Sequence, residues 1–211
     1  MKLRNLLPMF ALAAAFVTPA KAAILVDGIG DTMAVPDNFA FKSQLEADSS
    51  LVTQSSNLLS ISLTEAARIT FYALGSESNL ENSFFFGSLN DTEQNYSYDP
   101  TRVIGSVDIT SPGTLGGLLF TSSGGLPAVP GLSNFGIFLP SGFSGTSFLT
   151  DRLVFGYDDG GPADDDFDDF VIAAQISPIP EVRTWFLMLA GFGLVGMQLR
   201  RNRLKAPSVA Y

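Results

Sequence analysis

The 211-residue chain contains neither cysteine nor histidine. The absence of cysteine excludes disulfides and thiol chemistry, and the absence of both residue types excludes zinc sites built from them. Without an imidazole, no nucleophile can be activated by a histidine base. The hydrophobic core must therefore stabilise the fold without covalent cross-links.

Basic residues are scarce between the two ends of the chain. Residues 23–180 carry four lysines and arginines against 20 aspartates and glutamates, a net charge of −16. A segment this acidic repels nucleic acid and anionic lipid headgroups, and it attracts cations or basic partners. We therefore expect no nucleic-acid partner.

The first 22 residues have the pattern of a secretory signal peptide. Lys2 and Arg4 precede an apolar run over residues 6–17, and Ala20 and Ala22 supply the small-x-small site that a signal peptidase needs. The alternative, a buried N-terminal helix, does not explain the basic flank and the cleavage motif together. The sequence thus predicts a signal peptide over residues 1–22, cleaved after Ala22.

The other end of the chain, residues 178–211, combines an apolar run with a basic cluster. The run Trp185–Leu199 has 15 residues and is followed by Arg200, Arg201 and Arg203. As a helix it would be about 22 Å long, short of the ~30 Å hydrocarbon core, although bilayer thinning and snorkelling arginines can compensate. Because an interfacial tryptophan and cytoplasmic arginines are typical of membrane spans, we expect one C-terminal transmembrane helix. The alternative is a buried hairpin helix, which the basic cluster disfavours.

Four features of this tail occur in a specific order: Pro180 and Glu181, then Trp185, a glycine-rich apolar helix and the arginine cluster. In this order they resemble the PEP-CTERM sorting signal of Gram-negative bacteria, over residues 180–205. The resemblance implies that an exosortase, an integral membrane enzyme, processes the tail after transient anchoring in the inner membrane. It also implies delivery to the cell envelope, outer surface or extracellular matrix, beside exopolysaccharide. Val182 stands where the family has proline, so the processing site stays open.

Between the two ends, short apolar runs with period-2 alternation dominate, and clusters of Gly, Ser, Asn, Asp and Pro separate them. Most of the 18 phenylalanines lie here and can fill the space between two sheets. The sequence therefore predicts an all-β fold, a single jelly-roll-like β-sandwich domain over residues 23–177. The expected strands are 58–63, 68–74, 83–86, 102–109, 134–139, 152–157 and 170–176.

The acidic segment between the last two expected strands is the main candidate site. Seven aspartates occupy the 12 positions from 158 to 169, and carboxylates this close need cations, N–H donors or full solvation. Because Ca²⁺ prefers several oxygen ligands, we predict a calcium site, with the alternating Asp164, Asp166 and Asp168 as first ligands and Asp158, Asp159 and Asp169 after them. The alternative is a solvated acidic hairpin whose aspartates only cap turns.

The predicted β-rich domain over residues 23–177, called the body below, carries a second resemblance. Segment 69–84 together with the acidic segment resembles an uncharacterised β-rich domain of bacterial surface and matrix proteins, over about residues 60–177. This resemblance implies a fold and a location, and it carries no established activity.

These observations favour an exported surface or matrix protein with a structural or binding role and no enzymatic activity. The alternative is a carboxylate-based polysaccharide hydrolase, because such enzymes need only two carboxyl groups. Hydrolases keep two isolated carboxyls whose environments separate their pKa values. Adjacent aspartates in one loop are instead typical of a cation site or of solvated charge.

Overall fold

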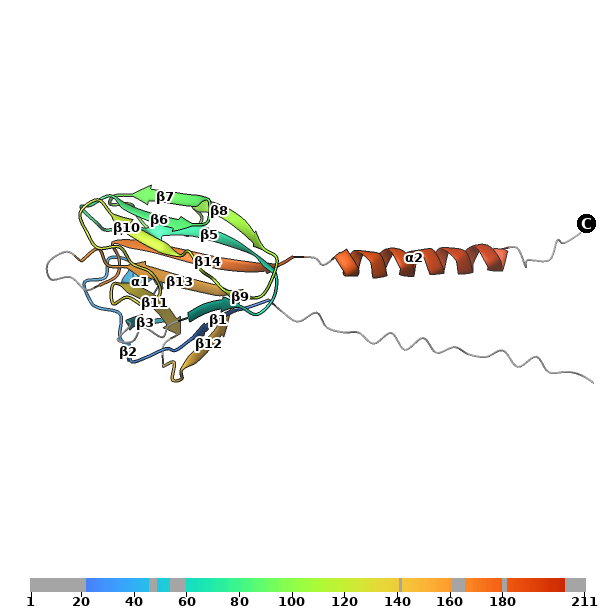
Figure 1. Ribbon diagram of the computed structural model, residues 1–211, viewed down its shortest axis with the longest axis horizontal. Helices are drawn as coiled ribbons and strands as arrows, with labels where there is room; N and C mark the ends of the chain where they lie inside the picture. The colour runs from blue at the N-terminus through green and yellow to red at the C-terminus, as the bar shows by residue number, and fades with distance from the viewer. Residues whose placement is uncertain are drawn as a thin grey trace, which may run out of the picture.

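The computed structural model describes residues 22–45, 49–53, 60–140, 142–160, 166–179 and 182–203. Within these residues the protein is mostly β, with three antiparallel sheets and two helices. The all-β prediction is therefore confirmed. The strands run from Ile24 to Pro178, and the long helix follows them (Figure 1).

The largest sheet has seven strands, and its centre is the hairpin of β13 and β14, which flank the acidic segment. Strand β14 is paired on its other side with β5. In spatial order the seven strands are β2 (Thr32–Met33), β3 (Ser49–Thr53), β11 (Phe135–Pro140), β13 (Arg152–Tyr157), β14 (Phe170–Pro178), β5 (Ala67–Gly75) and β8 (Val103–Ile109).

Two smaller sheets pack on one face of the large sheet. One buried cluster contains side chains from all three sheets, which places them around a shared core. The four-stranded sheet consists of β12 (Ser147–Thr150), β1 (Ile24–Asp27), β4 (Ser60–Leu63) and β9 (Gly113–Thr114). The three-stranded sheet consists of β10 (Leu119–Ser122), β6 (Asn82–Phe86) and β7 (Leu89–Glu93).

Aromatic side chains fill the space between the large sheet and the three-stranded sheet. Phe71 of β5 lies 5.1 Å, centroid to centroid, from Phe84 of β6. Phe120 of β10 stacks on Tyr157 of β13 at 5.2 Å. Such ring pairs contribute about 0.5–1.5 kcal/mol each beyond the area they bury. The two layers are therefore joined by aromatic contacts close to the acidic segment.

The opposite face of the large sheet is covered by the segment 35–45, which ends in the short helix α1 (Lys42–Leu45). Phe39 and Phe41 of this segment pack with Phe138 of β11 and Val171 of β14 in a second buried cluster. The central strands are thus covered on both faces, which explains why β14 begins with five consecutive buried residues.

The predicted strands and the structure agree well. All seven predicted strands have a counterpart, with ends shifted by a few residues, and residues 58 and 59 lie outside the described part of the chain. Seven further strands were not predicted: β1, β2, β3, β7, β9, β10 and β12.

The C-terminal helix α2 (Val182–Arg203) lies apart from the β-rich body (Figure 1). Large apolar side chains along it are exposed, including Leu189, Phe192 and Leu194. In the portion of the chain that the structure describes, no helix combines the length and the apolar character needed to cross a membrane.

Several predicted positions lie outside the described residues. The signal peptide does so except for Ala22, which is buried, and so do Ala20, Pro180 and Glu181. Of the remaining tail positions, Trp185, Arg201 and Arg203 are described only as part of the helical backbone, and Arg200 is exposed.

Candidate metal centre

The acidic segment connects Tyr157, the last residue of β13, to Phe170, the first of β14. Asp164 and Asp165 lie outside the described residues. The other five aspartates are all buried, with exposed fractions of 1–8%: Asp158, Asp159, Asp166, Asp168 and Asp169. A solvated hairpin would expose these carboxylates, so solvation does not describe these five residues, although Asp158 does cap the turn at Gly160.

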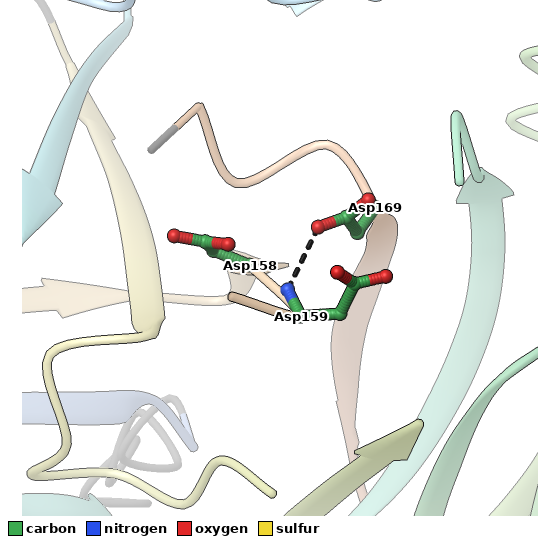
Figure 2. A group of neighbouring side chains, drawn as sticks. All are labelled: Asp158, Asp159 and Asp169. Atoms are coloured by element: carbon green, nitrogen blue, oxygen red, sulfur yellow. Dashed lines mark hydrogen bonds between the residues drawn. The ribbon is translucent and has the colours of Figure 1, made fainter. Parts of the chain in front are cut away.

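Three of these aspartates form one group. Asp158, Asp159 and Asp169 each offer a carboxylate oxygen, and the three oxygens lie within 4.8 Å of one another. Figure 2 shows Asp158 and Asp159 side by side in the chain and Asp169 approaching them from the other end of the segment. The hairpin geometry therefore brings together residues that are ten positions apart.

Neutral donors orient these carboxylates. The Asp159 N–H donates to Asp169 Oδ2 at 2.7 Å, and the Gly160 N–H donates to Asp158 Oδ1 at 2.7 Å. Ser78 Oγ donates to Asp159 Oδ2, also at 2.7 Å. Because these donors carry no charge, their hydrogen bonds fix the carboxylates without neutralising them.

Neighbouring segments hold the backbone of the group in place. The Asp169 carbonyl accepts hydrogen bonds from Ser76 Oγ at 2.6 Å and from Asn82 Nδ2 at 3.1 Å. The Asp159 carbonyl accepts one from the Leu126 N–H at 3.1 Å. The site thus lies where the large sheet meets the three-stranded sheet, and both contribute to it.

The negative field of the group is evident at its neighbour Tyr157. Burial raises the pKa of this phenol well above its usual value, and the charges of Asp159, Asp169 and Asp158 raise it further. The hydroxyl therefore stays protonated, and it donates to the Leu126 carbonyl.

Asp166 and Asp168 have a different role from the predicted one. Asp166 Oδ2 accepts a hydrogen bond from Asn38 Nδ2 at 2.7 Å, and Asp168 Oδ2 accepts one from the Ala40 N–H. Both carboxylates therefore hold the 35–45 segment on the large sheet. Burial raises the pKa of Asp168 to about 6, while the hydrogen bond from Ala40 lowers it.

Among the described residues, the group consists of Asp158, Asp159 and Asp169, and it does not include Asp166 or Asp168. Asp164 lies outside the described residues, so the predicted order of ligands stays a prediction. Adjacent residues of an extended chain point to opposite sides. Asp169 accordingly faces Asp159 while Asp168 faces Ala40. Asp166 and Asp168, two positions apart, both face the 35–45 segment, although the backbone of Phe167 between them is left-handed with φ of 64°.

Sequence reasoning missed the polar residues of the neighbouring chain segments. Ser78 and Asn82 contact Asp159 from positions 81 and 77 residues away. The sequence did contain a sign that Asn82 is buried. Asn82 lies on the same face of β6 as Phe84 and Phe86, and all three side chains are buried. An amide on the apolar face of a strand indicates a buried polar partner.

Comparisons with protein-family models, with curated proteins and with solved structures found no match to this chain. The resemblances of the tail and of the body therefore stay predictions.

Proposed function

We propose that this chain is an exported cell-surface or extracellular-matrix protein whose β-rich body is stabilised by Ca²⁺ at Asp158, Asp159 and Asp169. The observation that carries the calcium proposal is that three buried aspartates each bring a carboxylate oxygen to within 4.8 Å of the others. Burial and mutual repulsion both disfavour three ionised groups at such a place. A bound cation would offset both effects.

Calcium is the ion that suits this ligand set best. The group offers only oxygen, the preference of hard cations, and it combines carboxylates with nearby carbonyls, as calcium sites commonly do. Mg²⁺ demands near-ideal octahedral geometry and keeps several of its waters, which a buried group accommodates poorly. Outside the cell, where calcium can be millimolar, even a site with a Kd of about 10⁻⁴–10⁻³ M would bind calcium to a large extent.

Export and sorting form the second part of the proposal. The signal peptide is removed after Ala22, and an exosortase-type membrane enzyme recognises residues 178–211 while the tail engages the inner membrane. Its support is the order of motifs in the sequence and the exposed apolar side chains of α2, a surface that calls for a membrane or a protein partner. Mass spectrometry of surface-located protein should give Ala23 as the first residue, and Met1 there would contradict export.

For the body, we propose a jelly-roll-like sandwich with a structural or binding role beside exopolysaccharide or another surface polymer. A hydrolase is less favoured, because the converging aspartates are buried. A glycosidase needs its carboxyl pair on either side of a bond that the polymer brings to it.

The calcium proposal is tested by thermal melts of the full-length chain in about 2 mM Ca²⁺ and in chelator, a concentration above the weak extracellular range. We expect calcium to raise the melting temperature by several degrees, because filling a site to ten times its Kd adds about 1.4 kcal/mol. The Asp158→Asn/Asp169→Asn double variant should lose this rise. Its charge-matched control, Asp27→Asn/Asp31→Asn, changes two exposed aspartates and should keep it.

A further inference from the structure

Asn82 is the most deeply buried polar residue beside the aspartate group. It begins β6, its exposed fraction is 0%, and its Oδ1 has no hydrogen-bond partner among the residues that the structure describes. A buried carbonyl oxygen without a partner is costly, and most such atoms in folded proteins do have one. This atom therefore needs an explanation.

The amide of Asn82 lies directly against the aspartates. Its Nδ2 is 3.2 Å from Asp159 Oδ2 and 3.1 Å from the Asp169 carbonyl oxygen. Nδ2 and Oδ1 belong to the same planar amide, so a half-turn about the Cβ–Cγ bond exchanges the two atoms and brings Oδ1 to the place where Nδ2 now faces the cluster. An asparagine carbonyl is a common calcium ligand.

The Asn82 amide can present either of its ends to the aspartate group. In the structure its Nδ2 donor faces the Asp159 carboxylate and the Asp169 carbonyl. With a cation, these oxygens serve as ligands, and rotation of the amide would turn Oδ1 to the same ion. We infer that Asn82 is the fourth ligand residue of the proposed calcium centre, together with Asp158, Asp159 and Asp169. This inference rests on the proposed function.

The fourth ligand comes from a different sheet. Asn82 pairs with Glu93 of β7 and Ser122 of β10 in the three-stranded sheet, whereas the aspartates border β13 and β14 of the large sheet. A cation held by both would link the two layers near the Phe120–Tyr157 stack. Calcium would then act as a cross-link between layers, in a chain that has no cysteine for a covalent one.

The test is a calcium titration of the full-length chain, with terbium luminescence as a second readout because Tyr157 is next to Asp158. Asn82→Ala should weaken Ca²⁺ binding by at least about 10-fold, because loss of a residue that only supports a metal ligand already costs about 10–100-fold. Asn82→Asp keeps an oxygen and adds a fourth charge, so it should melt lower in chelator and show a larger calcium-induced rise than the wild type. The control Asn90→Ala removes an exposed asparagine from β7 and should bind like the wild type.

The outcomes separate this inference from the proposed function. Calcium binding by the wild type with equal affinity in Asn82→Ala would overturn the role of Asn82 and leave the three-aspartate site standing. No binding by the wild type would overturn both. If Asn82→Ala does not fold, Asn82→Asp decides, and a calcium-induced rise no larger than that of the wild type would contradict the inference.

Discussion

The backbone N–H of Asp159 donates a 2.7 Å hydrogen bond to the carboxylate of Asp169 and so ties the start of the acidic segment to its end (Figure 2). The same contact holds the two carboxylates close together, although their charges repel. This hydrogen bond is one of several that keep the group assembled, and a cation would relieve the repulsion that remains.

Replacing Asp169 with asparagine separates the hydrogen bond from the charge repulsion. The Asn side-chain oxygen can still accept from Asp159, but one negative charge is lost. In chelator we expect Asp169→Asn to melt at or above the wild-type temperature, because repulsion falls. In calcium it should lose most of the roughly 1.4 kcal/mol that a site filled to ten times its Kd provides. A variant that keeps the full calcium effect would remove Asp169 from the site.

A substitution at Gly125 tests how closely the chain packs against the backbone of Asp159. A side chain at this position would collide with the carbonyl oxygen of Asp159. Gly125→Ala should therefore destabilise the protein by about 1–3 kcal/mol in chemical denaturation, as overpacking does, and weaken calcium binding. Gly116→Ala is the matched control, because a methyl group there meets nothing within 4 Å. Equal stability of the two variants would contradict the close packing around Asp159.

Asp168 should behave as an anchor of the 35–45 segment and not as a ligand. Asp168→Ala removes the acceptor of the Ala40 N–H. We expect the Ala40 amide to exchange with solvent about fivefold faster, the equivalent of roughly 1 kcal/mol for one hydrogen bond. Calcium affinity should stay close to the wild-type value. Loss of calcium binding with unchanged Ala40 exchange would reverse the assignment.

The tail is tested by deletion in cells. Removing residues 180–211 should release the body into the periplasm or the medium, because the proposed sorting signal is lost. Cell fractionation and immunoblotting follow the protein, and the full-length chain is the control. A truncated protein that stays at the surface would contradict the sorting proposal, as would a mature full-length protein that retains Arg203.

The sequence predicted the central strands well because burial leaves a clear pattern in them. Strand β5 alternates buried and less buried residues over most of its length, and β14 begins with five consecutive apolar residues. The missed strands carry weaker patterns. Strand β7, Leu89–Glu93, has no fully buried residue, and β9 has only two residues. Their pairing depends on neighbours that are distant in sequence.

The candidate site was predictable in composition and not in geometry. Clustered aspartates between two strands indicate a cation site at a hairpin. Which carboxylates converge depends on the local backbone, including the left-handed Phe167. The contact with Asn82 depends on the packing of two sheets, since it joins residues 77 positions apart. Tertiary structure of this kind leaves little trace in a single sequence.

Direct titration of the full-length chain with Ca²⁺ by isothermal calorimetry tests the central claim most directly. We predict saturable binding with a Kd of about 10⁻³ M or tighter, lost in Asp158→Asn/Asp169→Asn and kept in Asp27→Asn/Asp31→Asn. Absence of saturable binding in the wild type would contradict the account, and so would equal binding in the Asp158→Asn/Asp169→Asn variant.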